Sequence, residues 1–210
     1  MSESNLRTRI KFCGITRLSD ALEAAHLGVD ALGFVFYPDS PRYIEPSKAA
    51  EIIEQLPAFV SCVGLFVNSP QKTVEQVIQL SKIDTLQFHG DEKPEYCTAY
   101  DLPYLKAIRM KPETDLLKLA NTYQSASALL LDSYTKGIPG GTGNTFDWAV
   151  IPASVSKPII LAGGLSSDNV ASAIKQINPY AVDTSGGIEQ AKGVKDAAKM
   201  AAFVNEVNNA

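Results

Sequence analysis

The sequence predicts an α/β fold in which roughly eight strand–helix units, each of about 25 residues, close into a parallel barrel. Short apolar runs alternate with longer helical patterns along the whole chain of 210 residues. Runs such as Leu32–Phe36 are almost continuously apolar, which is typical of parallel strands that are buried on both faces. No low-complexity linker divides the chain, so we expect residues 1–210 to form one domain.

The predicted strands are the short apolar runs, and the predicted helices are the amphipathic segments between them. The strands are Arg9–Phe12, Ala31–Phe36, Phe59–Phe66, Thr85–Phe88, Tyr104–Ile108, Ala128–Leu131, Pro158–Leu161 and Tyr180–Val182. The helices are Ser19–Leu27, Pro46–Leu56, Pro70–Ser81, Pro94–Tyr100, Thr114–Tyr123, Ser167–Ile177 and Val194–Val207. Several helices begin with Ser or with Pro in the first turn, as helix starts commonly do.

Two architectures satisfy this alternation, since strands separated by helices pair in parallel through right-handed crossovers. One is a closed (β/α)8 barrel, or TIM barrel, and the other is an open doubly wound sheet. Eight units favour closure, although 210 residues lie near the short end of the range for barrels. The sequence has no GxGxxG after the first strand and no GxxxxGK[ST], which would favour an open nucleotide-binding sheet. We therefore predict a single-domain TIM barrel.

Charge and cysteine content exclude several classes of protein. The chain has 19 Lys and Arg against 23 Asp and Glu and no basic run, so we expect neither nucleic acid nor a membrane surface as a partner. The longest apolar stretch, Ala58–Val67, is interrupted by Ser61 and is shorter than the roughly 20 residues that a membrane helix needs. The three cysteines form neither a CxxC motif nor an even framework, which indicates free thiols and a cytoplasmic location.

Polar residues gather where the predicted strands end, which is where barrels carry their chemistry. Side chains two residues apart on a strand share a face. On this basis the residues that share the mouth of the barrel are Lys11, Cys13, Gln87, His89, Asp132, Asp183 and Ser185. Burying charges without partners is costly, so we expect these groups to pair with one another or with a ligand.

Two glycine pairs follow the last two strands. Gly163 and Gly164 come after the seventh strand, and Gly186 and Gly187 come after the eighth, directly behind Ser185. Glycine lets backbone N–H groups approach an anion closely, and these two loops form the recurrent phosphate site of the fold. We predict a phosphate site here rather than tight turns alone.

Segments spread over nearly the whole chain resemble the phosphoribosylanthranilate isomerase family of tryptophan biosynthesis. They are KFCGITRLSDA at Lys11–Ala21, GFVFYPDSPRYI at Gly33–Ile44, QFHGDE at Gln87–Glu92, LLLD at Leu129–Asp132, GGTGNTFDW at Gly140–Trp148, LAGGLSSDNV at Leu161–Val170 and DTSGGIE at Asp183–Glu189. The first two segments are specific to that family, whereas the glycine segments are shared more widely among phosphate-binding barrels.

The resemblance implies an Amadori rearrangement without cofactor or metal. In that reaction N-(5-phosphoribosyl)anthranilate, a small phosphorylated aminoaldose, becomes 1-(o-carboxyphenylamino)-1-deoxyribulose 5-phosphate. The family's general base corresponds to Cys13 and its general acid to Asp132. Arg42 matches the arginine that holds the anthranilate carboxylate, and Asp183 would accept from the anthranilate N–H. Gln87 and His89 would line the pocket.

The two proton-transfer roles make different demands on their surroundings. A carboxyl group that donates a proton at neutral pH needs a raised pKa, which apolar surroundings can supply. Cys13 needs thiolate character, so its pKa should fall below the usual value. Lys11 is a candidate source of the positive charge that does this, but it could instead pair with Asp183. The family often has two serines before the final glycine; here Gly186 follows Ser185, so backbone N–H groups would replace one phosphate contact.

Other functions on the same fold fit the residues less well. The related aminoaldose isomerase of histidine biosynthesis resembles two fused half-barrels with an Asp on each half, and this chain has no internal repeat. An indole-forming barrel would need other acid–base residues, and a pyridoxal-phosphate barrel would leave Cys13 unexplained. A non-catalytic phosphosugar-binding module would keep its function after mutation of Cys13 or Asp132. The default expectation for assembly is a monomer, and a homodimer is left open.

Overall fold

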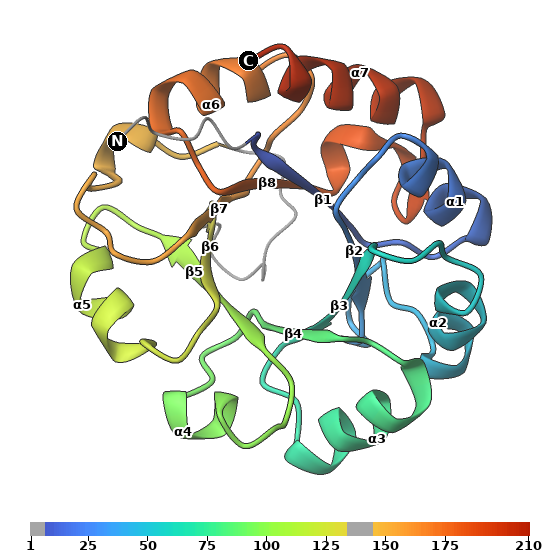
Figure 1. Cartoon of the computed structure of the whole chain (residues 1–210). Helices are drawn as coiled ribbons and strands as arrows, with labels where there is room; N and C mark the ends of the chain where they lie inside the picture. The colour runs from blue at the N-terminus through green and yellow to red at the C-terminus, as the bar shows by residue number, and fades with distance from the viewer. Residues whose placement is uncertain (1–6, 134–144) are drawn as a thin grey trace.

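Eight parallel strands form a closed barrel in the computed structural model, which describes residues 7–133 and 145–210 (Figure 1). Each strand pairs with the next along the chain, and β1 pairs with β8 to close the ring. The strands are β1 (Arg9–Cys13), β2 (Ala31–Val35), β3 (Ser61–Phe66), β4 (Thr85–Phe88), β5 (Tyr104–Met110), β6 (Ala128–Ser133), β7 (Ile159–Leu161) and β8 (Ala181–Thr184). The predicted TIM barrel is confirmed, and the open doubly wound sheet is excluded.

The α-helices of the described ranges surround the barrel as an outer ring (Figure 1). They are α1 (Leu18–His26), α2 (Pro46–Ile53), α3 (Gln71–Ser81), α4 (Pro94–Cys97), α5 (Leu116–Thr122), α6 (Val170–Ile177) and α7 (Ala197–Asn208). Between β6 and β7, the described residues form only the short 3-10 helix η1 (Trp148–Val150). The last helix, α7, lies beside α1, so the ring of helices closes where the barrel closes.

Side chains along each strand alternate between two apolar layers. Phe12 on β1 packs between the barrel and its helices, with its ring 5.8 Å from that of Phe203 on α7. Leu130 on β6 belongs instead to the cluster inside the barrel. Because every second side chain shares a face, Asp132 follows Leu130 on the inner side and Cys13 lies opposite in direction to Phe12. The alternation therefore directs the polar strand ends toward the barrel axis.

The prediction of a helix from Val194 is wrong at its start. Val194–Lys195 forms the strand β10, which pairs antiparallel with β9 (Glu189–Ala191) behind the 3-10 helix η2 (Gly186–Ile188). The helix α7 begins only after Asp196, whose carboxylate accepts from the N–H of Lys199 as an N-cap. Apolar spacing alone could not reveal this start, because it continues unchanged through the hairpin into the helix.

Most other helices are shorter than predicted by a few residues at one or both ends. For example, α2 ends at Ile53 and not at Leu56, and Pro70 precedes α3 as its N-cap. Apolar positions extend past the hydrogen-bonded turns, so periodicity overestimates the length of a helix.

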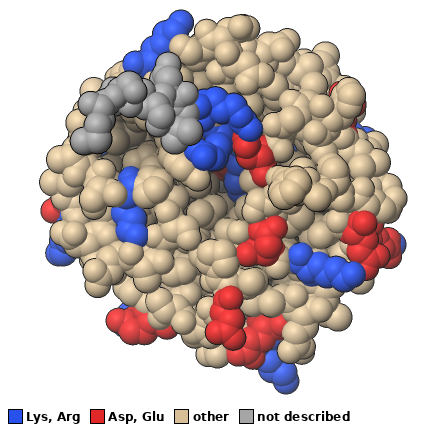
Figure 2. All heavy atoms as spheres, in the orientation of Figure 1, with Lys and Arg blue, Asp and Glu red and all other residues tan. Residues whose placement is uncertain are grey.

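The charged side chains visible in Figure 2 lie scattered among uncharged residues, with both signs present on this face. No continuous field of one sign covers the face shown. In residues 7–133 and 145–210, no helix has the length and apolar character needed to cross a membrane.

Candidate active site

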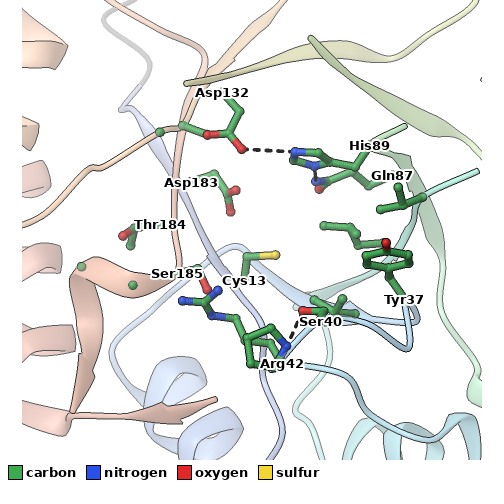
Figure 3. Close-up of a pocket in the computed structure, with 18 of the residues that line it drawn as sticks. Cys13, Tyr37, Ser40, Arg42, Gln87, His89, Asp132, Asp183, Thr184 and Ser185 are labelled. Carbon is green, nitrogen blue, oxygen red and sulfur yellow. Dashed lines mark hydrogen bonds and ion pairs between the residues drawn. The ribbon is translucent and has the colours of Figure 1, made fainter. Parts of the chain in front are cut away.

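A pocket lies at the carboxyl ends of the barrel strands and collects nearly all the predicted site residues (Figure 3). The predicted residues that line it are Cys13, Arg42, Gln87, His89, Asp132, Gly163, Gly164, Asp183, Ser185, Gly186 and Gly187. Lys11 is buried and contacts this set through Asp183. Cys13 from β1 and Asp132 from β6, which are separated by 119 positions in the sequence (132 − 13), therefore face one cavity.

Lys11 pairs with Asp183 across the junction of β1 and β8. The two residues stand opposite each other in the strand register, and Lys11 Nζ donates to Asp183 Oδ1 at 2.8 Å. Burial lowers the pKa of Lys11, but attraction to Asp183 and Cys13 outweighs it, so the pKa lies above its usual value. Burial raises the pKa of Asp183, and Lys11 opposes that shift. Lys11 thus stays cationic inside the barrel.

The expected lowering of the Cys13 pKa is wrong. Burial of the thiol, together with the negative charge of Asp183, raises its pKa by more than the positive charges of Lys11 and Lys195 lower it. Lys11 nevertheless lies beside Cys13 as well as Asp183: a Cβ added to Gly33 would meet Cys13 Sγ at 2.8 Å and Lys11 Nζ at 3.2 Å. The two roles left open for Lys11 are therefore compatible, because it pairs with Asp183 and also acts on the thiol.

A hydrogen-bond chain orients the carboxylate of Asp132. The amide of Gln87 donates to His89 Nδ1 at 2.9 Å, which leaves the ring proton on Nε2. His89 Nε2 in turn donates to Asp132 Oδ2 at 3.2 Å (Figure 3). The other oxygen, Asp132 Oδ1, accepts from the N–H of Ser133 at 2.8 Å. Asp132 is thus fixed by two donors, one on each oxygen.

Two glycines in the loops after β7 and β8, Gly163 and Gly187, have no room for a side chain. Gly163 has φ +81°, and a Cβ there would lie 2.6 Å from Ser133 N. A Cβ on Gly187 would lie 2.0 Å from the carbonyl oxygen of Leu165, which also accepts from Thr184 Oγ1 at 2.7 Å. The lack of side chains leaves backbone exposed to the pocket, as an anion site requires.

Arg42 lies in the pocket but is already bound to a carboxylate of the protein. Its Nε and Nη2 donate to Glu189 Oε1 and Oε2, both at 2.8 Å. A guanidinium has donors on two edges, and Glu189 occupies only the edge that contains Nε. The opposite edge, which contains Nη1, is the part of Arg42 that can receive a ligand carboxylate.

Sequence reasoning missed Glu189 and Lys195 as parts of this site. Glu189 is the last residue of a segment that carried the resemblance, but no motif assigned it a role. Lys195 sits in the unexpected hairpin and bears no sequence signal beyond a charge next to Asp196. Tyr37 and Ser40, which also line the pocket, belong to the segment Gly33–Ile44 and could have been found from it.

Comparison with known proteins identifies the family to which the chain belongs. The family model of N-(5'phosphoribosyl)anthranilate (PRA) isomerase matches residues 10–206. The N-(5'-phosphoribosyl)anthranilate isomerase of Nitrosococcus oceani is 57% identical over 204 residues, which are 97% of this chain and 99% of that protein.

Solved structures agree with that match. The phosphoribosyl anthranilate isomerase of Thermotoga maritima has a TM-score of 0.89 at 38% identity, over 97% of this chain and 100% of that one. A further phosphoribosyl anthranilate isomerase was solved with reduced 1-(o-carboxyphenylamino)-1-deoxyribulose 5-phosphate. It has a TM-score of 0.86 at 37% identity, over 97% of this chain and 100% of that one. Of the segments that carried the resemblance, residues 140–144 lie outside the described part of the chain.

Proposed function

The chain belongs to the N-(5'-phosphoribosyl)anthranilate isomerase family, and from this premise we propose which residues perform the reaction. The protein is an isomerase of tryptophan biosynthesis. Its substrate, N-(5-phosphoribosyl)anthranilate, carries a phosphate at one end and a carboxylate at the other. In this proposal the glycine loops and Arg42 bind the two anions, and Cys13 and Asp132, which line the same pocket, act on the sugar.

The first step opens the sugar ring. Asp132, in its protonated form, gives a proton to the ring oxygen as the bond from that oxygen to C1′ breaks, and a Schiff base to the anthranilate nitrogen forms. His89 and the N–H of Ser133 hold the two oxygens of Asp132, so the carboxyl group meets the substrate in one orientation. A positioned acid of this kind contributes about 10²–10⁴-fold to a rate.

The second step removes the proton from C2′. Cys13, as the thiolate, takes that proton, and the electron pair moves toward the Schiff base to give an enolamine. Tautomerisation then adds a proton to C1′ and removes the one on the C2′ hydroxyl, which leaves the ketone. The charge of Lys11 beside the thiol favours the thiolate and opposes the effect of burial.

Contacts to its two anions would hold the substrate within reach of the acid and the base. Gly163 and Gly164, with Ser185, Gly186 and Gly187, would bind the phosphate. The free edge of Arg42 would bind the anthranilate carboxylate through paired N–H donors. Asp183, held by Lys11, would accept from the anthranilate N–H, and Gln87 and His89 would form the wall of the pocket.

The observation that carries the proposal is the convergence of Cys13 and Asp132, from β1 and β6, on the pocket that also contains the glycine loops. The test follows the loss of substrate fluorescence with purified protein and no added metal or cofactor. We expect conversion to 1-(o-carboxyphenylamino)-1-deoxyribulose 5-phosphate, identified by mass and by its reduction product. Unchanged substrate, or conversion only after a metal or cofactor is added, would contradict the proposal.

A further inference from the structure

The side chain of Arg42 lines the pocket and packs directly against the backbone of Gly14. Gly14 has φ +76°, and a Cβ there would lie 2.5 Å from Arg42 Cδ. The Arg42 side chain is only 12% exposed, although it belongs to a loop after β2. An arginine on a loop usually retains rotamer freedom that binding must then remove. The residues packed around Arg42 have already removed this rotamer freedom.

Glu189 is the residue that holds the guanidinium. Both of its carboxylate oxygens accept from Arg42 at 2.8 Å, which is the two-pronged geometry that orients a guanidinium plane. Burial raises the pKa of Glu189, but hydrogen bonds from Arg42 and the charge of Lys195 outweigh it, so the pKa lies below its usual value. The carboxyl group of Glu189 is therefore ionised at neutral pH, beside Arg42.

Glu189 is itself held from the side away from the pocket. Lys195 Nζ donates to Glu189 Oε1 at 2.9 Å, and the N–H of Gly193 donates to the same oxygen at 3.2 Å. The lysine also donates to the carbonyl oxygen of Cys13 at 2.6 Å and to Ser185 Oγ at 3.3 Å. The hairpin β9–β10 thus ties together the loops that carry the base, the arginine and the phosphate-binding serine.

The cluster of Arg42, Glu189 and Lys195 carries more positive than negative charge. Arg42 and Lys195 supply two positive charges, and Glu189 supplies one negative charge between them. A second carboxylate, supplied by a ligand, would complete the pairing on the free edge of Arg42. Two readings of Glu189 follow: it either holds Arg42 ready for that ligand, or competes with the ligand for Arg42.

We propose that Glu189 is a positioning residue that presents the free edge of Arg42 to the substrate carboxylate and so makes that carboxylate a determinant of specificity. The proposal rests on the proposed function. The bonds from Lys195 and Gly193 favour it over competition, because a carboxylate held by two further donors cannot swing away without leaving the buried charge of Lys195 with hydrogen bonds alone and no opposite charge. Preorganisation of Arg42 lets the ligand bind without immobilising a long side chain.

The test measures the binding of two ligands by calorimetry. One is reduced 1-(o-carboxyphenylamino)-1-deoxyribulose 5-phosphate, and the other is the same compound without the ring carboxyl group. We expect E189Q to weaken the first ligand by about tenfold or more and to leave the second within about twofold, as the loss of one charged contact predicts. In the Arg42→Ala background, E189Q is expected to add nothing, because the two residues act as one unit.

Each other outcome overturns the proposal. Tighter binding of the carboxylate ligand to E189Q means that Glu189 competes for Arg42. Equal weakening of both ligands, or an effect that persists without Arg42, means that Glu189 only supports the fold, and no change means that it has no role in binding. If E189Q does not fold, E189D is measured instead, because it keeps a negative charge beside Lys195 but shortens the side chain that holds Arg42. A wild-type protein that binds both ligands equally contradicts the carboxylate role of Arg42, which is a failure of the proposed function.

Discussion

Lys11 Nζ lies 2.8 Å from Asp183 Oδ1 inside the barrel, and the same ammonium group stands beside the thiol of Cys13. The negative charge of Asp183 offsets part of the effect of Lys11 on Cys13. Burial is then the largest influence on the titration of the thiol and raises its pKa. A ligand that engages Asp183 through an N–H would shift this balance toward the thiolate, which couples activation of the base to binding.

The raised pKa of Cys13 predicts a particular pH dependence of thiol reactivity. Below the pKa the thiolate fraction increases about tenfold for each pH unit, so alkylation of Cys13 by iodoacetamide should keep accelerating from pH 7 to 9. Mass spectrometry of the modified peptide measures this rate. In the control variant Cys13→Ala, Cys62 and Cys97 should stay unmodified, because burial raises their pKa values to about 12. A rate that levels off at or below pH 7 would show a preformed thiolate and contradict the raised pKa of Cys13.

Replacing Arg42 should separate binding of the carboxylate from turnover. Arg42→Ala removes the donors proposed for the anthranilate carboxylate, and we expect KM to rise about 10- to 100-fold with a smaller change in kcat. Arg42→Lys should not restore KM, since one ammonium cannot hold Glu189 and a ligand carboxylate in the same plane. Steady-state kinetics of the variants checks this. A large loss in kcat at unchanged KM would place Arg42 in the chemical step instead.

A methyl group on Gly187 should disrupt the phosphate loop. Its Cβ would lie 2.0 Å from the carbonyl oxygen of Leu165, so the loop must move away from β7. We expect Gly187→Ala to weaken the phosphate-bearing product analogue by about tenfold or more in a calorimetric titration. Gly28→Ala is the matched control, because Gly28 has φ +80° but open space around it. That variant should lose only about 1–2 kcal/mol of stability to backbone strain and keep its affinity.

Equal affinities for the analogue in the two glycine variants would show that the loop after β8 does not bind the phosphate.

The ion pair between Lys106 and Glu92 should matter more for stability than any surface pair. Lys106 Nζ donates to Glu92 Oε2 at 3.0 Å and to the carbonyl oxygen of Gly90 at 2.7 Å, with both side chains 3% or less exposed. Lys106→Met removes the positive charge beside the buried carboxylate and leaves it only the N–H donors of Asn68 and Gly90, and we expect a loss of about 3–5 kcal/mol in urea unfolding. Lys82→Met breaks the exposed pair with Glu54 and should cost less than about 1 kcal/mol.

Unfolding of Lys106→Met also bears on the active site, because Lys106 holds the loop that carries His89. Similar unfolding free energies for Lys106→Met and Lys82→Met would mean that the buried pair adds no more than a surface pair does.

The architecture could be predicted from the sequence because each unit repeats the same physical pattern. A strand that is buried on both faces must be apolar on both faces. Runs such as Leu129–Leu131 show this pattern locally, so the strand can be predicted without knowledge of the rest of the chain. The hairpin β9–β10 could not be predicted, because Val194 continues the apolar spacing of α7. In the hairpin Lys195 is buried against Glu189, and this contact exists only in the folded protein.

The candidate site could be predicted in its membership but not in its electrostatics. The alternation of side chains is enough to direct Cys13, Gln87 and Asp132 toward one pocket. The pKa of Cys13 depends on how far the effect of burial exceeds the effect of nearby charges. Neither effect can be read from a sequence. The partner of Arg42 was missed for the same reason, since Glu189 is 147 residues away along the chain.

The most direct measurement is the kcat of Cys13→Ala and Asp132→Asn on N-(5-phosphoribosyl)anthranilate, with the affinity of each variant for the product analogue measured in parallel. If these side chains are the base and the acid, each variant should lose about 10²–10⁴-fold in kcat while its affinity for the analogue stays within a few-fold of wild type. Turnover close to that of wild type in either variant would contradict the account, because the reaction would then proceed without the group assigned to it.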